Sequence, residues 1–245
     1  RRQPARKSNR NVDLVIMSQV PVGFTRRLST ELNTRDPQNH FKIFYQVETL
    51  VIGDAIARAR SPEMLIIGQE DGAEELSQPF ASYLKSFNCT VVLMGYESAE
   101  LAKASINSYL MSAVAMANTF AEVCEKVGAD WSEIIPALRL DKRIGENAYI
   151  EAGLGLSGGH LERDLRTMLD IAEDLGVHSN VIKSWDSSSK HRREWVADII
   201  NSEIIPSDSP PKIGIWGLSY KPGTDSTKNS VSIELINNLT QNEIS

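Results

Sequence analysis

Residues 97–127 read ESAELAKASINSYLMSAVAMANTFAEVCEKV, a run of 31 positions without Pro or Gly. Apolar residues recur in it at steps of four and three, at Ile106, Leu110, Ala113, Ala117, Phe120, Cys124 and Val127. This spacing predicts one long amphipathic helix, which Gly128 ends as a C-terminal cap. At about 1.5 Å per residue the helix would be roughly 45 Å long, so we expect it to link two lobes or to pack against a partner.

Lys103 and Asn107 lie four positions apart near the start of this helix and therefore share one face. A neutral amide follows the Lys at the spacing where an acid would form an ordinary ion pair. The two residues are therefore a candidate site. The alternative interpretation is a solvated Lys on an exposed face, and the spacing alone leaves both open.

The composition limits the classes of protein to which the chain can belong. The chain has 245 residues, of which 41% are hydrophobic and 24% charged, an ordinary globular balance for one large or two ordinary domains. A net charge of −6 argues against a general nucleic-acid binder, although residues 1–10 form a basic run. Cys89 and Cys124 are expected to be buried thiols in a reducing, cytoplasmic compartment, without the spacing of a metal site. No membrane association is expected, because no apolar stretch approaches the roughly 20 residues that span a bilayer.

Short apolar runs alternate with helical segments upstream of the long helix. Strands are predicted at 12–17, 41–45, 64–67 and 90–94, and helices at 24–32 and 73–87. The first run, VDLVIM, is typical of a strand buried on both faces of a parallel sheet. The alternation predicts an α/β sheet whose ligands gather at the carboxyl ends of strands. Glu48 follows the second strand and is a candidate site carboxylate, although a surface acid is the default interpretation.

Downstream of the long helix, further helices are predicted at 131–138, 165–175, 185–200 and 230–239. The third would face solvent through Lys190, His191, Arg192 and Arg193. Residues 153–164, GLGLSGGHLERD, form a Gly-rich loop that permits close approach to a ligand, and the next helix would offer its N-terminal amides to an anion. No strand precedes this loop, so its match to G-x-G-x-x-G is taken as coincidental. Residues 206–211 are expected to be a linker, and 212–218, KIGIWGL, a new buried strand.

Several blocks resemble the UDP-glucose/GDP-mannose dehydrogenase family, which uses NAD to oxidise C6 of a nucleotide sugar to a carboxylate. SQVPVG at 18–23 resembles STVPVG, QVETLVIGDAI at 46–56 resembles NPEFLxEGxA, and ESAELAKASIN at 97–107 resembles SAELxKxxxN. EKVGAD at 125–130 and LDKRIG at 140–145 are nearly identical to the corresponding blocks of the family. GGHLERD at 158–164 stands where GSCFPKD is expected, and GLSYKPGTDSTKNS at 217–230 resembles GxxFKxxTDDxRxS. The blocks keep the family's order over almost the whole chain.

The resemblance implies an α/β fold with Rossmann-like parallel-sheet lobes joined by a central helical domain with one long helix. It assigns 1–95 to the C-terminal part of an NAD-binding domain, 96–205 to a central dimerisation domain, and 206–245 to the incomplete start of a nucleotide-sugar-binding α/β domain. The family's cofactor glycine loop would lie before Arg1, so we expect a fragment, a processed form or part of a longer protein. The implied partners are NAD, a nucleotide sugar and a second copy bound through the long helix, in polysaccharide biosynthesis.

Carried over by position, the resemblance implies that Lys103 and Asn107 stabilise a developing oxyanion. Asp164 would act as acid/base with a water, and Glu48 would assist hydrolysis. The implied substrate-binding residues are Arg143, which would reach a phosphate across a subunit contact, and Tyr149, Ile150, Gly158, Gly159 and Lys221. The implied cofactor-binding residues are Val20, Pro21 and Arg163.

The chain departs from the family at its nucleophile. Aligned on Asp164, the position of the catalytic Cys holds His160; aligned on the two preceding glycines, it holds Leu161. Cys124 is no substitute because it lies on the apolar stripe, so the thioester route is closed. Other positions also differ: Gln19 for Thr, Ile52 for a second Glu, Arg163 for Lys, and Lys228 and Asn229 for Arg and Glu.

Three functions remain open. The first is a degenerate dehydrogenase, a pseudoenzyme that binds nucleotide sugar with reduced or no four-electron oxidation. The second is an altered oxidoreductase that stops at the aldehyde, with His160 as general base. The third is a non-catalytic structural or regulatory subunit. NADH production, the oxidised products and saturable sugar binding would separate them.

Overall fold

The computed structural model describes residues 11–37, 41–50, 53–70, 75–157, 159–204 and 212–241, with only the backbone of 159 and 160. The chain divides into two compact units, Arg1–Ser105 and Ile106–Ser245. The division falls inside the longest helix, α4 (Tyr96–Val127). The basic run at 1–10, Ile52, Gly158 and the linker at 206–211 lie outside the described residues.

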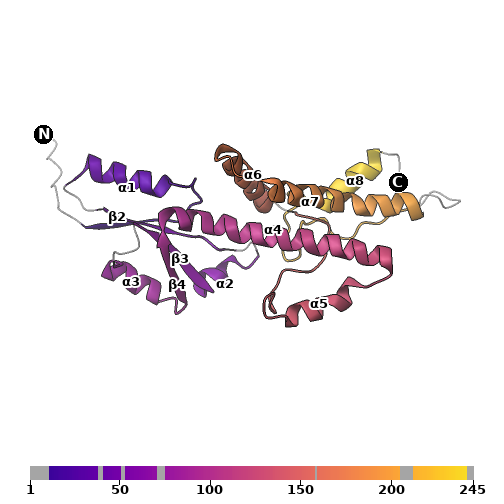
Figure 1. Ribbon diagram of the computed structural model, residues 1–245, viewed down its shortest axis with the longest axis horizontal. Coiled ribbons are helices and arrows are strands. Elements are labelled where there is room, and N and C mark those ends of the chain that lie inside the picture. Colours follow the sequence, from indigo (N-terminus) through magenta and orange to yellow (C-terminus); the bar gives the residue numbers. More distant parts are fainter. Residues whose placement is uncertain are drawn as a thin grey trace. The chain divides into compact units, whose positions relative to one another are not determined.

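Unit 1 is built on a four-stranded sheet (Figure 1). Its strands lie in the order β1 (Val12–Ile16), β2 (Phe41–Gln46), β3 (Met64–Gln69) and β4 (Thr90–Gly95). β1 and β2 pair in parallel, as do β3 and β4, which confirms the predicted α/β class. One pairing differs from the expectation, because β2 and β3 run antiparallel through Tyr45–Gly68 and Gln46–Ile67. This contact spans two residue pairs, so the sheet remains predominantly parallel.

Both faces of the sheet carry a hydrophobic core. Successive strand residues point to opposite faces, so Phe44 and Tyr45 enter different clusters. Phe44 packs with Phe80 of α3 (Gln78–Lys85), and Tyr45 packs with Ala99 in the first turns of α4. α1 (Phe24–Arg35) and α3 lie on opposite faces (Figure 1), while α2 (Ala55–Arg60) connects β2 to β3.

Two predictions for unit 1 are wrong in detail. The strand at 12–16 is not buried on both faces, because β1 has only β2 beside it in the described sheet, and Val12 and Leu14 are partly exposed. The helix predicted from 73 begins at Gln78, where the Ser77 Oγ accepts a hydrogen bond from the Phe80 amide at 3.3 Å. Ser77 is thus an N-cap, which fixes the start of the helix.

Unit 2 is helical in its described part. It contains the rest of α4, α5 (Trp131–Leu140), α6 (Gly159–Asp174), α7 (Asn180–Ile199) with a π-helical extension (Ile200–Ile204), and α8 (Val231–Gln241). One core cluster joins α4 to α5 and contains Ala117, Ala121, Cys124, Trp131, Ile135 and Ile150. A second cluster joins Met111 of α4 to Leu156 and to Leu165 of α6. The predicted long helix is confirmed.

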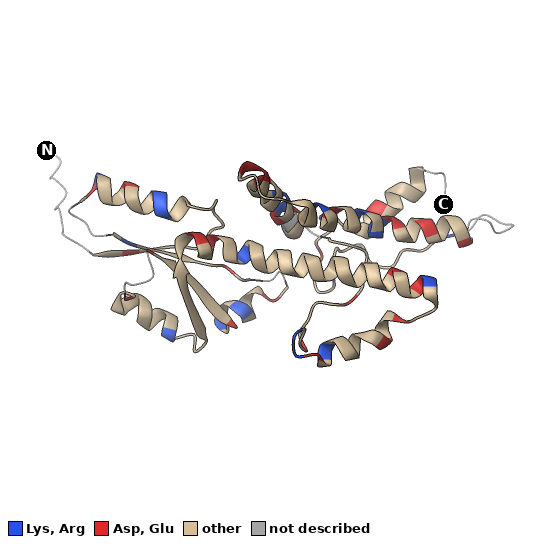
Figure 2. Cartoon of the chain, in the orientation of Figure 1, with Lys and Arg blue, Asp and Glu red and all other residues tan. Residues whose placement is uncertain are grey.

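The apolar residues of α4, which the sequence predicts to form one continuous stripe, lie in two different environments. Ala117 and Cys124 are buried in the α5 cluster, whereas Phe120 is 52% exposed and Val127 70% exposed. Charged residues of α4 gather at its two ends and leave residues 104–121 uncharged (Figure 2). Among the described residues, no helix has the length and apolarity needed to cross a membrane. Cys89 is only partly buried, contrary to expectation, because it lies at the margin of the sheet core.

Three further predictions for unit 2 are corrected. The Gly-rich loop is shorter than expected, because α6 begins at Gly159 and takes in residues 160–164. Residues 212–218 form no strand, and Trp216 is fully exposed, because an isolated strand lacks neighbours for its backbone groups. Arg192 does not face solvent and is 6% exposed, since its Nε donates to the Gly153 carbonyl at 3.0 Å and its guanidinium lies over the Trp195 ring.

Candidate functional site

Lys103 and Glu48 form an ion pair within unit 1. The Lys103 Nζ lies 3.1 Å from the Glu48 Oε2. Glu48 comes two residues after β2 and also accepts a hydrogen bond from the Leu50 amide, so its carboxylate is held from two sides. Both side chains are partly buried. Lys103 is therefore not a solvated surface Lys, and Glu48 is not an isolated surface acid.

A second carboxylate lies close by in unit 1 and was missed by the sequence analysis. Glu100 is buried and accepts hydrogen bonds from the backbone amides of Gly23 and Thr25, the latter at 2.8 Å. It thereby satisfies amides at the N-terminus of α1. Burial raises the pKa of the Tyr45 hydroxyl, and the charges of Glu100 and Glu48 raise it further. An acid flanked by Ala99 and Leu101 was the available signal in the sequence.

The predicted cofactor residues Val20 and Pro21 lie in the turn between β1 and α1. Val20 packs against the Tyr45 cluster of the sheet, and Pro21 is exposed, with its carbonyl accepting from the Phe24 amide at 3.0 Å. Because Glu100 already occupies amides at this helix N-terminus, a dinucleotide phosphate would meet a negative charge there. The turn therefore suits an apolar contact rather than phosphate binding.

Asn107 and Asp164 come together within unit 2 from positions 57 residues apart. The Asn107 Nδ2 donates to the Asp164 Oδ2 at 2.6 Å, which joins α4 to α6. Asp164 is 1% exposed, and its other oxygen lies 3.6 Å from the Arg163 guanidinium. A buried carboxylate oriented by an amide can accept a proton from a hydroxyl group or a water. The pair therefore has the composition of an acid/base site.

The Gly-rich loop is held against α4 and α7 before α6 begins. The Leu156 amide donates to the Ser189 Oγ at 2.8 Å, and the Gly153 amide donates to the Asn118 Oδ1 at 2.7 Å. Gly155 adopts a left-handed backbone conformation with φ of 83°, and a Cβ there would lie 2.6 Å from the Ser189 carbonyl oxygen. This glycine therefore serves close packing on α7 rather than approach to a ligand.

Arg143, Tyr149 and Ile150 lie between α5 and the Gly-rich loop. Arg143 is exposed and engaged by Asp141, whose carboxylate contacts its backbone amide, Nε and Nη2. The same hydrogen bonds lower the pKa of Asp141 and raise the pKa of Arg143. Tyr149 is exposed, whereas Ile150 is buried in the α4–α5 cluster, and its carbonyl accepts from the Trp131 Nε1 at 3.0 Å.

The remaining predicted residues surround the start of α6 and the segment before α8. Gly159 begins α6, and the side chain of Arg163 is exposed. Lys221 follows Tyr220, whose carbonyl accepts from the Ser157 Oγ of the Gly-rich loop at 3.0 Å. Gly158 and the side chain of His160 lie outside the described part of the chain. In that described part, no group of His, Cys, Asp and Glu side chains is arranged to hold a metal ion.

Comparison with known proteins identifies what this chain is similar to. Residues 97–190 match the central domain of the UDP-glucose/GDP-mannose dehydrogenase family. The chain is 28% identical over 232 residues to the UDP-glucose 6-dehydrogenase of Pseudomonas aeruginosa, covering 92% of this chain and 51% of that protein. It is 31% identical over 195 residues to the UDP-glucose 6-dehydrogenase AglM of Haloferax volcanii, covering 78% and 45%. It thus spans about half the length of the curated relatives it matches.

Solved structures agree with the sequence comparison. A UDP-glucose dehydrogenase from the hyperthermophilic archaeon Pyrobaculum islandicum superimposes with a TM-score of 0.81 at 26% identity, over 95% of this chain and 53% of that one. A UDP-D-ManNAc dehydrogenase from Pyrococcus horikoshii gives a TM-score of 0.74 at 22% identity, over 93% and 54%. The second likeness concerns the fold alone.

Proposed function

Because this chain belongs to the UDP-glucose/GDP-mannose dehydrogenase family, we propose that it binds a nucleotide sugar and carries part of an NAD-dependent nucleotide-sugar 6-dehydrogenase. The observation that carries the proposal is the 2.6 Å contact between Asn107 and the buried Asp164. These are two residues to which the resemblance assigns chemistry, and the chain folds to join them. A buried, oriented carboxylate suits proton transfer at a sugar hydroxyl.

The other residues take supporting roles in this proposal. Within unit 1, Lys103 stabilises negative charge on oxygen while Glu48 assists hydrolysis. Nucleotide-sugar contacts come from Arg143, Tyr149, Ile150, Gly158, Gly159 and Lys221. NAD supplies the hydride acceptor when bound, and its contacts come from Val20, Pro21 and Arg163. By the same reasoning, residues 1–95 belong to the NAD-binding domain, 96–205 to the central helical domain and 206–245 to the sugar-binding domain.

Four-electron oxidation is reduced or lost in this proposal. Neither His160 nor Leu161 supplies the thiol that would trap the aldehyde. Cys124 is 5% exposed and packs against Trp131, so it is not accessible to a substrate. Cys89 precedes β4 and packs at the margin of the sheet core. A dehydrogenase without a thiol at the position of the nucleophile has no route to the thioester.

A second copy of the chain is the proposed partner of α4. Residues 106–127 carry an exposed apolar face with spacings of three, four and seven, formed by Ile106, Tyr109, Met116, Phe120, Val123 and Val127. Such an apolar row on a helix gains stability by packing against another apolar surface. A homodimer through this face would bury the row on both copies at once.

Calorimetric titration of the full chain with UDP-glucose tests the binding proposal. We expect saturable binding, and Lys221→Met should weaken it about tenfold by removing one charge-assisted contact. Lys190→Met is the matched control, because Lys190 is exposed on α7 and pairs with Asp186. An affinity unchanged by Lys221→Met, or no saturation at millimolar UDP-glucose, would contradict the proposal.

A product assay tests the catalytic part. The full chain is incubated with NAD and a panel of UDP-sugars, and NADH, sugar aldehyde and sugar acid are quantified. We expect little or no sugar acid. Aldehyde with one NADH per sugar would instead support the altered oxidoreductase with His160 as base. Sugar acid formed by purified protein would overturn the assignment of a degenerate site.

A further inference from the structure

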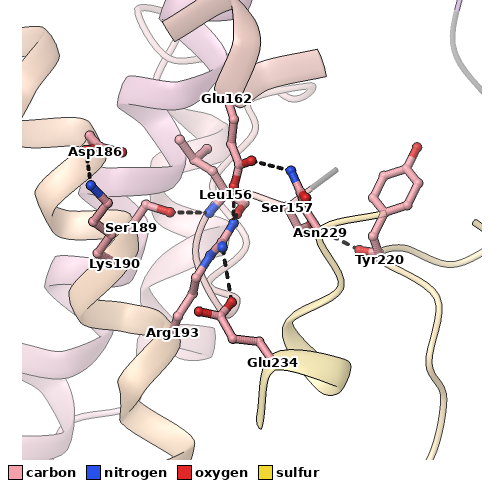
Figure 3. Close-up of polar contacts among 10 residues, drawn as sticks. All are labelled: Leu156, Ser157, Glu162, Asp186, Ser189, Lys190, Arg193, Tyr220, Asn229 and Glu234. Carbon is pink, nitrogen blue, oxygen red and sulfur yellow. Dashed lines mark hydrogen bonds and ion pairs between the residues drawn. The ribbon is translucent and has the colours of Figure 1, made fainter. Parts of the chain in front are cut away.

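Four polar side chains from three segments of unit 2 meet beside the Gly-rich loop (Figure 3). The Arg193 guanidinium of α7 donates to the Leu156 carbonyl and to Glu162 in α6, and lies 3.1 Å from Glu234 in α8. Glu162 also accepts a hydrogen bond from the Asn229 Nδ2. One carboxylate, that of Glu162, thus joins α7 to the segment that leads into α8.

This cluster is well shielded from solvent at its centre. The Arg193 side chain is 16% exposed and is placed between two carboxylates and a carbonyl oxygen. Hydrogen bonds in which one partner is charged are stronger than neutral ones, and burial strengthens them further. The neighbouring Lys190 is engaged by Asp186 at 2.7 Å (Figure 3), so it is not the partner of Glu162.

The side chains of Glu162 and Asn229 match one another in this contact, because the Glu162 carboxylate accepts the hydrogen bond that the Asn229 Nδ2 donates. An ionised carboxylate has no donor, so an acid at 229 would place a second negative charge against Glu162 and lose this hydrogen bond. Asn229 also adopts φ of 53°, a left-handed conformation that Asn tolerates better than Glu. Asn229 therefore suits this position in charge, in hydrogen bonding and in backbone conformation.

We propose that Glu162 is a positioning residue, which clamps the segment 219–241 to the start of α6 through Arg193 and Asn229. The clamp acts on one proposed substrate-binding residue and one proposed acid/base residue, since Lys221 lies in the clamped segment and Asp164 lies two positions after Glu162. The Ser157–Tyr220 hydrogen bond at 3.0 Å ties the same segment to the Gly-rich loop. Glu162 thus fixes Lys221 relative to Asp164 for a nucleotide sugar, and this role rests on the proposed function.

Hydrogen exchange followed by mass spectrometry on the full chain tests the clamp without any ligand. Asn229→Asp keeps the size of the side chain and its tolerance of positive φ, but replaces the Nδ2 donor with a negative oxygen facing Glu162. We expect the backbone amides of 219–230 to exchange about tenfold faster. In the double variant Asn229→Asp with Glu162→Gln, the amide at 162 can donate to the carboxylate at 229, which restores the hydrogen bond in the opposite direction. The exchange rate of these amides should then return toward that of the wild type.

Asn237→Asp is the matched control, because it makes the same charge change at an exposed position of α8. Unchanged exchange in Asn229→Asp, or no rescue by the double variant, would overturn the clamp. UDP-glucose titration of the same variants tests positioning: affinity should fall about tenfold in Asn229→Asp and recover in the double variant. If hydrogen exchange changes in Asn229→Asp but the affinity for UDP-glucose does not, Glu162 has no positioning role. Wild-type protein that does not bind UDP-glucose would contradict the proposed function and the positioning role, while the exchange data would still decide the clamp.

Discussion

At the scale of single residues, the Arg26–Glu97 pair is the most strongly perturbed ionisable contact described in unit 1. The Arg26 Nε lies 2.5 Å from the Glu97 Oε1, and the Nη2 lies 2.9 Å from the other oxygen. These hydrogen bonds lower the pKa of Glu97 from 4.5 to about 2. The pair joins α1 to the first turn of α4, so its charge state bears on the stability of unit 1.

The lowered pKa predicts how stability depends on pH. A carboxylate whose pKa is depressed on folding stabilises the protein above its unfolded pKa and loses that effect as pH falls through the folded pKa. Glu97→Gln should therefore cost about 1 kcal/mol at pH 7, a figure discounted for the partly exposed pair. The difference from wild type should shrink between pH 4.5 and about 2. Urea unfolding across this range measures it, and a difference independent of pH would contradict the assignment.

Gly155 gives a second prediction at this scale. Its φ is 83°, and an added Cβ would lie 2.6 Å from the Ser189 carbonyl oxygen and 2.9 Å from its Oγ. Gly155→Ala should therefore lower the free energy of unfolding by about 2 kcal/mol, by strain and by displacement of the loop from α7. Gly153→Ala is the control, because a Cβ there meets nothing within 4 Å. Equal unfolding free energies for the two variants would show that the loop does not need this close packing.

At the scale of elements, the apolar residues of α4 lie in two environments, one buried and one exposed. Ala117 and Cys124 pack against Trp131, while Phe120 and Val127 remain exposed. The same three- and four-residue periodicity marks both sets, since a helix has more than one face that repeats at these steps. Periodicity therefore predicted the helix correctly, but it placed Phe120 and Val127 on the same continuous stripe as Ala117 and Cys124, and the structure divides this stripe into a buried and an exposed set.

The exposed face of α4 predicts an assembly that charge can disrupt. Tyr109→Asp combined with Phe120→Asp should convert a dimer to monomers, because both side chains lie on the exposed face and each copy would bring charge into the apolar contact. Sedimentation velocity at micromolar concentration measures the change. Val177→Asp combined with Val181→Asp is the control, because it adds the same two charges at exposed positions outside α4. An unchanged sedimentation coefficient in the double variant would show that this face of α4 does not form a dimer interface.

At the scale of the whole molecule, the missing thiol predicts the outcome of restoring it. His160→Cys, in the register set by Asp164, should raise sugar-acid formation from UDP-glucose and NAD at least tenfold over wild type. His160→Ser is the control, because it shortens the side chain without providing a thiolate. Leu161→Cys tests the other register. Acid formation in neither Cys variant would contradict the proposal that the missing nucleophile alone limits four-electron oxidation.

Much of the architecture was predictable because local patterns carry it. The alternating strands and helices, the 32-residue α4 and the final helix α8 follow from periodicity and helix signals. The pattern failed at 212–218, where KIGIWGL has strand composition but pairs with nothing in the described structure. Strand formation depends on a neighbouring strand, which composition cannot supply. Arg192 and Arg193 were likewise taken for solvent-facing residues, because their carbonyl and carboxylate partners come from distant segments.

The sequence by itself determined the α/β class, the long helix, the resemblance to nucleotide-sugar dehydrogenases and the absence of a thiol at 160 and 161. Only the tertiary structure decided which side chains meet: Lys103 with Glu48, Asn107 with Asp164, and Glu162 with Arg193 and Asn229. The physical reason is the distance along the sequence over which each effect acts. Backbone periodicity acts over a few neighbouring residues, whereas a contact such as Asn107–Asp164 joins positions 57 residues apart and exists only once the helices between them have packed.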